Sequence, residues 1–565
     1  MKILLIASAF NSLTQRVFAE LRDHGHHVVV ELVQRPVDSV RQAVRRHQPE
    51  LIIAPMLTTA IPKDIWSAFT CLVVHPGPMG DRGPSSLDRA IGEGAQQWGV
   101  TVLQADAVMD AGDVWATAPC AMPSVGKSDL YRGEITDAAV SAVLQAVERF
   151  MSGTHTPQRQ DAEDDSGTRP WLAQSGRRIA WLSDPTEAVL RKLRAADSQP
   201  GVLDELLGAE WFLHGGHPED ELRGPAGHLL ATRDGAICRA TTDGAVWIPE
   251  LRPQAQRGAP ATFKLPAVSA LGSRLPDIPE VTAPLVLPPG RRTWTEIDYR
   301  QVGPVGLLRF SFPGGAMSTG QCRRLLTAYR FACAQPTTVL LLGGARDFFS
   351  NGIHLNVIEA AEDPAAESWA NINAMDDLVE AVLSTTDRIT VAALGGNASA
   401  GGVMLALAAD EVWCRSGVVL NPHYRLMGLY GSEYWTHSLP RRVGAVRTGR
   451  LMRQALPVST ACAHRIGLVD RLVAATPEQF TAEVLQLAGV RAAEPALSEQ
   501  IAAKEAAFGP ARAAALAACR REELARMRRN FYGPDEPYHA LRAAFVRKQK
   551  AAGTPEHLAA AAAGC

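Results

Sequence analysis

The sequence has no excess of either charge. Its 57 Lys and Arg residues stand against 59 Asp and Glu residues, which gives a formal net charge of −2. Because contacts to nucleic-acid phosphates need clustered Lys and Arg side chains, this balance argues against nucleic-acid binding as the main activity. At about 150 residues per domain, the length predicts two to four domains.

Metal-binding cysteine patterns are also absent. The nine cysteines are spread along the chain and include no CxxC pair, so we predict no metal site. An odd number of cysteines in a large chain fits reduced thiols, and therefore a cytoplasmic location. The apolar start Met1–Ala9 is too short for a signal peptide, and we interpret it as a first strand.

Long uncharged runs are missing, with one exception. Ile389–Ala409 contains 21 residues without a charge, which is long enough to cross a bilayer. Four Gly residues, an Asn and a Ser interrupt this run, and no aromatic belt flanks it. We therefore expect no membrane segment, but a buried strand, a turn and a helix that opens at Gly401-Gly402. The first N–H groups of such a helix have no helical partner and can stabilise an anion.

The pattern of apolar runs predicts an α/β protein with three modules. Residues 1–160 form a βαβ series, which predicts a parallel, Rossmann-like sheet, although the dinucleotide fingerprint Gly-x-Gly-x-x-Gly is absent. Residues 171–270 contain short strands and the hairpin signal Asp243-Gly244, which predicts a small β-rich module. Residues 290–565 alternate strands and helices again and end in a helical tail rich in Ala and Arg.

A His and an Asp follow two strands of the first module. His75 follows the strand Leu72–Val74, and Asp110 comes shortly after the strand Gly99–Gln104. In open α/β sheets ligands bind beyond the carboxyl ends of strands, so the two side chains can converge on one carbonyl group. One would polarise the oxygen, and the other would orient the nucleophile or move its proton. The alternative is a packing His and a turn Asp.

The residues around this pair resemble the 10-formyltetrahydrofolate-dependent formyltransferases, most closely the methionyl-tRNA type. The resemblance also covers the second module, which is then expected to be a small, OB-like β-barrel. It implies a formyl-folate donor with His75 and Asp110 as catalytic residues. The Asn of that family, two residues before its His, is Val73 here, which puts transfer to an amine in doubt. The matching motifs are His75-Pro76-Gly77, Arg82-Gly83-Pro84-Ser85, Gly99-Val100-Thr101-Val102 and Met109-Asp110-Ala111-Gly112-Asp113. The resemblance implies that Pro76, Gly77, Arg82 and Gly83 contact the folate.

A second Gly-rich turn precedes the uncharged run. Together the two turns resemble the crotonase superfamily, the enoyl-CoA hydratase and isomerase fold, over about residues 293–473. This resemblance implies a coenzyme A (CoA) thioester site whose oxyanion hole consists of the backbone N–H groups of Ile353 and Gly401. The remaining residues that the two turns are expected to place in the CoA site are Ser350, Gly352, His354, Leu355 and Gly402.

The second site departs from the hydratase pattern. The two Glu residues of hydratases are replaced by Met404 and His423, so water addition lacks its acid and base. Tyr424 and Glu433 are the catalytic candidates instead, with His423 and Tyr430 as CoA contacts. A Glu in an aromatic, dry pocket has a raised pKa and can exchange protons near neutrality. The alternative is that Glu433 caps a helix.

The order of the two halves resembles the HoxX/HypX family of nickel–iron hydrogenase maturation factors over essentially the whole chain. That resemblance implies a bifunctional enzyme that moves formyl from the folate to CoA and then releases carbon monoxide, the ligand of the hydrogenase iron. Folate, CoA and hydrogenase or maturation proteins would be its partners, and a continuous channel would join its halves. The alternatives are hydrolysis of formyl-CoA to formate, or a non-catalytic maturation scaffold.

Overall fold

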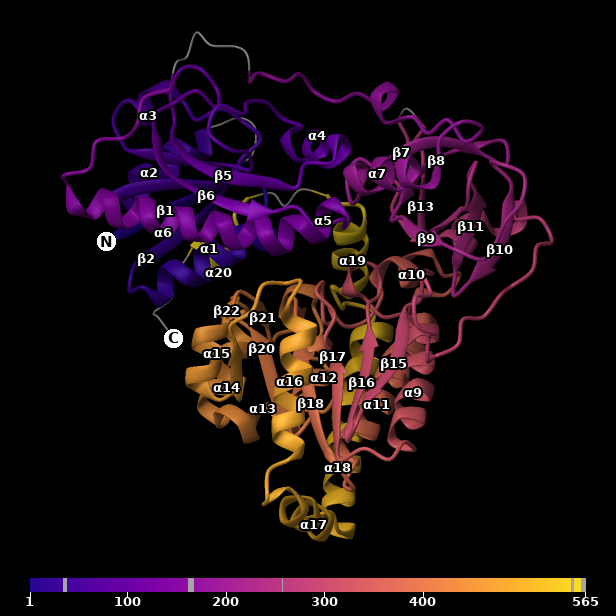
Figure 1. Cartoon of the computed structure of the whole chain (residues 1–565). Helices are drawn as coiled ribbons and strands as arrows, with labels where there is room; N and C mark the ends of the chain where they lie inside the picture. Colours follow the sequence, from indigo (N-terminus) through magenta and orange to yellow (C-terminus); the bar gives the residue numbers. More distant parts are fainter. Residues whose placement is uncertain (34–37, 161–166, 257, 550–552, 560–565) are drawn as a thin grey trace.

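The computed structural model describes residues 1–33, 38–160, 167–256, 258–549 and 553–559. Its strands gather into three groups, here called the N-terminal, middle and C-terminal units (Figure 1). In that view the indigo N-terminal unit and the magenta middle unit lie above the C-terminal unit. This order follows the three predicted modules, whose boundaries stay predictions.

The N-terminal unit is a six-stranded sheet with helices on both faces. Its strands are β1 (Lys2–Ala7), β2 (His27–Leu32), β3 (Leu51–Met56), β4 (Cys71–His75), β5 (Gln97–Gln104) and β6 (Val114–Ala121). Its helical segments are α1 (Ser12–Asp23), α2 (Asp38–His47), α3 (Lys63–Trp66), α4 (Ser86–Glu93), α5 (Lys127–Leu130), the π-helical turn η1 (Tyr131–Ile135) and α6 (Thr136–Ser152). Along β1, Ile3 and Leu5 pack with α1 and α6, whereas Leu4 and Ile6 pack with α2. Both faces are buried, which explains the continuous apolar strand sequence.

The sheet is not parallel throughout, which corrects the prediction. Its order is β2-β1-β3-β4-β5-β6, and β5 runs antiparallel to both β4 and β6. Gln104 at the end of β5 therefore lies opposite Leu72 near the start of β4, while His75 lies opposite Thr101. The apolar pattern of a short strand identifies the strand but not its direction, which depends on pairing across the sheet.

The middle unit contains two four-stranded sheets around one apolar core. Their orders are β10-β11-β12-β9 and β14-β13-β8-β7, and both contribute to the same core cluster, as expected for a small barrel. The predicted hairpin is confirmed, because Ala240 pairs with Ala245 across the Asp243-Gly244 turn. Its elements are η2 (Gln174–Arg177), α7 (Thr186–Ala196), β7 (Val202–Leu206), β8 (Ala209–His214), β9 (His217–Glu219), β10 (Leu229–Arg233), β11 (Ala236–Ala240), β12 (Ala245–Ile248), β13 (Glu250–Pro253), β14 (Leu265–Pro266), α8 (Ala267–Leu271) and η3 (Gly272–Arg274).

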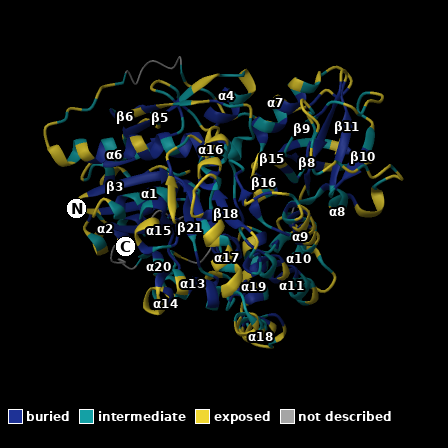
Figure 2. Cartoon of the chain, turned by 60° about the horizontal axis from the view of Figure 1, so that its bottom comes forward, coloured by how far each residue is buried: buried dark blue, intermediate teal, exposed yellow. Residues whose placement is uncertain are grey.

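The C-terminal unit has a six-stranded sheet, β15-β16-β17-β18-β20-β23, and a three-stranded sheet, β19-β21-β22. Buried strands separate the helices on the two faces of the large sheet (Figure 2). Its elements are β15 (Ile297–Val302), β16 (Val305–Phe310), η4 (Pro313–Gly315), α9 (Thr319–Cys333), β17 (Val339–Gly343), α10 (Leu355–Ala360), α11 (Pro364–Leu383), β18 (Ile389–Leu394), β19 (Ala398–Ser399), α12 (Gly401–Leu407), β20 (Glu411–Arg415), β21 (Val419–Asn421), η5 (Arg425–Met427), α13 (Trp435–Val443), α14 (Ala445–Gln454), β22 (Val458–Ser459), α15 (Thr460–Ile466), β23 (Arg471–Val473) and α16 (Phe480–Ala492).

The helical tail returns to the other units. It comprises α17 (Leu497–Ala507), α18 (Pro510–Tyr532), α19 (Tyr538–Val546) and α20 (Glu556–Ala559). Helix α18 packs against α11 and α13, whereas α20 lies beside β2 of the N-terminal unit (Figure 1). Leu558 of α20 is buried in the core of the N-terminal sheet.

The uncharged run Ile389–Ala409 folds as predicted into a strand, a turn and a helix. It contains β18, β19 and α12, which begins at Gly401. Within the described ranges, no helix is both long and apolar enough to cross a membrane.

Two further expectations concern the cysteines, which we expected to be reduced, and a metal site, which we did not expect. In the described ranges seven cysteines are free thiols, but Cys462 is disulfide-bonded, which does not fit a fully reduced set. No cluster of three or more potential metal-binding side chains occurs in the part of the chain that the structure describes.

Candidate active sites

His75 lies between two carboxylates at the end of β4. Its Nε2 is 2.9 Å from Asp81 Oδ2, and its Nδ1 is 3.6 Å from Asp110 Oδ2. All three side chains are largely buried, so the two contacts fix the plane of the imidazole ring. The structure therefore brings His75 and Asp110 together, although Asp110 lies in a turn; their catalytic role stays a prediction.

The turn after His75 is anchored through its backbone carbonyls. Ser86 Oγ and Trp98 Nε1 both donate to Pro76 O, at 2.9 and 3.0 Å, and Thr101 Oγ1 donates to Gly77 O at 2.8 Å. A side chain at residue 77 would overlap the His75–Asp81 pair, since its Cβ would lie 2.3 Å from Asp81 Oδ2. Glycine is needed because the backbone passes so close to the imidazole.

Asp110 reaches His75 although β5 is antiparallel to β4. The loop between β5 and β6 returns to its strand at Gly112, where a Cβ would lie only 1.8 Å from Gln104 O. Asp110 itself has a left-handed backbone, φ 59°. Its Oδ2 also accepts a hydrogen bond from Gly83 N at 3.2 Å, which links this loop to the predicted folate residues Arg82 and Gly83. Arg82 is buried nearby.

In the C-terminal unit, the two Gly-rich turns lie against each other. Ser399 N donates to Ser350 O, and Phe349 N donates to Asn397 O. Within the described chain, neither Ile353 N nor Gly401 N donates to a protein acceptor. Both amides are therefore available to bind an oxyanion, as the resemblance implies.

The Gly401-Gly402 pair is required by contacts on two sides. A Cβ on Gly401 would lie 2.0 Å from Glu433 Oε1, and a Cβ on Gly402 would lie 2.0 Å from Ser350 O. The first glycine therefore allows the Glu433 carboxyl to approach the start of α12. The second allows the two turns to close.

Glu433 and Tyr424 form a buried pair at this point. The Tyr424 hydroxyl donates to Glu433 Oε2 at 2.8 Å, and Ser432 N donates to the same oxygen at 3.1 Å. Glu433 is 1% exposed. Burial, followed by the charge of Asp376, raises the pKa of Glu433 to about 8, and burial also raises the pKa of Tyr424 well above its usual value. The Glu433 carboxyl can therefore hold or release a proton near neutral pH.

The interpretation of Glu433 as a helix cap is wrong. Helix α13 begins at Trp435, and the residue before it, Tyr434, follows Glu433 in the chain. Another carboxylate binds that helix start: Glu523 accepts hydrogen bonds from Tyr434 N and Thr436 N, at 2.9 and 2.8 Å.

The other predicted CoA contacts have identifiable local roles. Ser350 Oγ accepts from Gly352 N at 3.1 Å and shapes the turn, while His354 Nδ1 caps α10 by accepting from Val357 N at 3.3 Å. Leu355 packs in an apolar cluster that also contains Tyr430. A role of these residues in CoA binding stays a prediction.

His423 and Tyr430, the other two predicted CoA contacts, lie in different environments. His423 is largely buried, and burial lowers its pKa to about 4, so the ring is neutral at physiological pH. The Tyr430 ring packs against Trp435 at 5.3 Å and lies under the Arg526 guanidinium at 4.4 Å. Tyr430 therefore supports the loop from outside, and its place among the CoA contacts also stays a prediction.

Three acidic residues at these sites, Asp81, Asp376 and Glu523, were not predicted from the sequence. Asp81 lies within the matched motif region, but nothing in its spacing distinguishes it from a turn residue. Asp376 and Glu523 lie inside helices α11 and α18, where an acidic residue is normally exposed. Both are fully buried here, and burial raises the pKa of each to about 7.

The N-terminal and C-terminal units are joined by ion pairs around the π-helical turn η1. Arg132 Nη2 is 2.8 Å from Asp347 Oδ2, and Arg346 Nη2 is 2.7 Å from Glu134 Oε2. Next to these pairs lies a cavity of about 810 Å³. Its walls come from all three units, including Arg132, Lys264 and Arg346.

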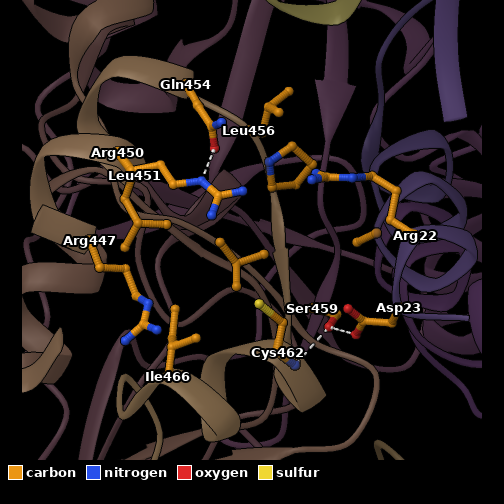
Figure 3. Close-up of a pocket in the computed structure, with 13 residues that line it drawn as sticks. Arg22, Asp23, Arg447, Arg450, Leu451, Gln454, Leu456, Ser459, Cys462 and Ile466 are labelled. Carbon is orange, nitrogen blue, oxygen red and sulfur yellow. Dashed lines mark hydrogen bonds between the residues drawn. The ribbon is translucent and has the colours of Figure 1, made fainter. Parts of the chain in front are cut away.

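A smaller pocket of about 60 Å³ lies elsewhere on the same junction (Figure 3). Arg22 and Asp23 of α1 face Arg450 and Ser459 of the C-terminal unit. Asp23 Oδ2 accepts a hydrogen bond from Ser459 Oγ. None of the predicted site residues lines this pocket, so we assign it to the contact between the units.

Comparisons with known proteins bear on the fold and the family of the chain. Residues 172–263 match the family described as formyl transferase, C-terminal domain, and residues 322–535 match enoyl-CoA hydratase/isomerase. The chain is 46% identical to the hydrogenase maturation factor HoxX of Bradyrhizobium diazoefficiens, over 98% of this chain and 96% of that one. The chain belongs to the HoxX/HypX family. The predicted family and fold class are thereby confirmed.

Other members and relatives of the HoxX/HypX family add detail. HypX from Aquifex aeolicus, solved in complex with tetrahydrofolic acid, is 42% identical with a TM-score of 0.95, covering 99% of this chain and 98% of that one. A methionyl-tRNA formyltransferase of Variovorax paradoxus is 26% identical over 40% of this chain and 71% of that one. The predicted likeness to methionyl-tRNA formyltransferases is thus confirmed.

Proposed function

We propose that this chain makes carbon monoxide for hydrogenase maturation in two steps, one in each half. In the first step, the thiol of CoA takes the formyl group from 10-formyltetrahydrofolate. In the second step, formyl-CoA releases carbon monoxide and regenerates CoA. The observation that carries the proposal is the buried Tyr424–Glu433 pair, which lies against Gly401. The positions of the two hydratase Glu residues hold Met404 and His423 instead.

The first step is proposed at His75. The CoA thiolate attacks the formyl carbon, the bond between that carbon and the folate nitrogen breaks, and the nitrogen takes up a proton. His75 would polarise the formyl oxygen, and Asp110 would steer the proton from the thiol to the nitrogen. Val73 offers no hydrogen-bond donor to the oxygen, which a strong thiolate nucleophile needs less than an amine does.

The second step needs no oxidant. The carbon–sulfur bond of formyl-CoA breaks, the formyl hydrogen leaves as a proton, and the sulfur receives a proton. The amides of Ile353 and Gly401 would hold the thioester oxygen, and Glu433 would exchange protons with the formyl hydrogen and the sulfur. The dry site matters because water would hydrolyse formyl-CoA to formate.

CoA binding is proposed at the junction of the three units. The cavity of about 810 Å³ has Arg132, Lys264 and Arg346 in its walls, together with the carboxylates that pair with them, Asp347, Glu250 and Asp129. The phosphates of CoA would replace these carboxylates as partners of the cations. From there the pantetheine arm would reach towards Gly401 or His75. We propose that one continuous channel serves both sites.

Isotopically labelled formyl-folate, incubated with CoA and the protein, tests the function. We expect label in gas trapped on haemoglobin. Label in formate alone would favour hydrolysis, and hydrogenase maturation that survives both His75→Ala and Glu433→Gln would favour a scaffold.

A further inference from the structure

The loop that carries Glu433 has an unusual backbone. Gly431, Glu433 and Tyr434 all have left-handed φ values, of 96°, 59° and 59°. Two adjacent non-glycine residues in this region are costly and persist only when their surroundings fix them. The loop therefore depends on contacts from outside itself.

Those contacts are mainly side-chain acceptors on helix α18. Glu523 accepts from Tyr434 N and Thr436 N, Met527 Sδ accepts from Gly431 N at 3.2 Å, and Asn530 Oδ1 accepts from Tyr430 N at 2.9 Å. Residues 523, 527 and 530 share one face of an α-helix. One helix face thus binds four N–H groups along the loop.

A second acceptor comes from helix α11. Asp376 Oδ1 accepts from Glu433 N at 2.8 Å and from Ser432 Oγ at 2.7 Å. Two consecutive backbone amides at Glu433 are therefore bound by different helices. The Glu433 amide donates to Asp376 of α11, and the following Tyr434 amide donates to Glu523 of α18.

The charged groups around this loop are unevenly distributed. Glu433, Asp376 and Glu523 are buried carboxyls, and Arg520 is a cation that faces them, with its Nε 3.9 Å from Asp376 Oδ2. Arg520 Nη2 and Nη1 bind Asp377 at 2.5 Å and Glu380 at 2.6 Å. The tyrosines facing Glu433 and Asp376 are Tyr424 and Tyr434. Asp376 and Glu523 both raise the pKa of Glu433.

We propose that Glu523 is a positioning residue for the second reaction step: it holds the loop so that the Glu433 carboxyl stays against Gly401. This inference rests on the proposed role of Glu433. Glu523 itself is bound to backbone amides and a threonine, so it acts through the loop.

The full-length Glu523→Gln variant tests the proposal. An amide keeps one acceptor oxygen but places an NH2 group against the second backbone N–H. We expect carbon monoxide release from formyl-CoA to fall roughly 10- to 100-fold in kcat with little change in KM, because the reacting group is displaced. Formyl transfer at His75 should be unchanged, and Glu523→Asp, which keeps both acceptors, should restore part of the rate.

The matched control is Glu499→Gln, on helix α17. Glu499 is exposed, so its loss should leave both steps unchanged. A parallel loss of both steps and of melting temperature in Glu523→Gln would instead mean a purely structural role. An unchanged rate and pH profile would overturn the proposal.

A spectroscopic measurement separates this proposal from the proposed function. The carboxyl infrared band of Glu433, assigned by its absence in Glu433→Gln, should titrate at lower pH in Glu523→Gln, because a negative neighbour is removed. This shift is expected even if the wild-type protein releases no carbon monoxide. An unmoved band would contradict the close approach of Glu523 to Glu433 on which the positioning role depends, whereas absent carbon monoxide with a moved band would contradict the function alone.

Discussion

The two candidate sites hold their acidic groups in opposite ways. In the N-terminal unit an imidazole lies between two carboxylates, so each acid has a basic partner. In the C-terminal unit three carboxyls are buried together, and the pKa of Glu433 is raised to about 8. The first arrangement suits an imidazole that keeps one orientation during a transfer between two substrates. The second suits a carboxyl that takes up and releases a proton during a reaction within one substrate.

The largest expected effect is that of His75→Ala. Removing the imidazole should slow formyl transfer from the folate to CoA roughly 100- to 1000-fold, because oxyanion polarisation and the orienting contact with Asp110 are both lost. Formation of formyl-CoA by chromatography measures this. Supplied formyl-CoA should still be converted by the variant at the wild-type rate, and a loss of that activity too would show that the sites are not separate.

Glu433→Gln should produce the reverse pattern. Without a titrating carboxyl, carbon monoxide release should fall roughly 100-fold, while formyl transfer continues. Formyl-CoA should then accumulate, which mass spectrometry detects. Normal release of carbon monoxide would mean that Glu433 does not move the proton.

Gly402→Ala tests whether the closeness of the two turns is needed. Its Cβ would lie 2.0 Å from Ser350 O, so the turns must separate and the oxyanion amides must move. We expect the second step to fall more than the first. Gly489→Ala, where nothing lies within 4 Å of the added Cβ, is the control and should be stabilising by about 1 kcal/mol or less. Equal effects of the two variants on the second step would contradict this.

The raised pKa of Glu433 predicts a pH-dependent stability. An unfolded Glu ionises near its usual value of 4.5, whereas the folded carboxyl keeps its proton up to about pH 8. The folded state therefore binds more protons in this window, and its stability should fall as pH rises from 4.5 to 8, by roughly 1 kcal/mol per pH unit. Melting temperatures across the window measure the effect, and the slope should be shallower in Glu433→Gln. An equal slope in the variant would assign the effect to other groups.

The smallest effect is expected from Val73→Asn, which restores the residue of amine formyltransferases. If a thiolate needs little help at the oxygen, transfer to CoA should change by less than about tenfold. Competition between CoA and an amine acceptor measures any change in preference. A large gain with CoA would contradict the explanation for Val73.

The sequence predicted the parts of each site that depend on local pattern. Gly401-Gly402 opens a helix and His75 ends a strand, as expected from motif position. Tyr424 and Glu433 were expected only as candidates, and their contact comes from the structure. The direction of β5 was not predictable, because it depends on long-range pairing. Asp376 and Glu523 were missed for the same reason: their burial results from the packing of α11 and α18 around a loop distant in the chain.

The return of α20 to the first sheet has a consequence for synthesis on the ribosome. Leu558 completes an apolar core whose other members are mostly residues of the first 150. That core stays partly uncovered until nearly the whole chain has been translated, although its sheet is made first. The two halves are therefore not independent products of translation, and separating them would leave the earlier half with an exposed apolar surface.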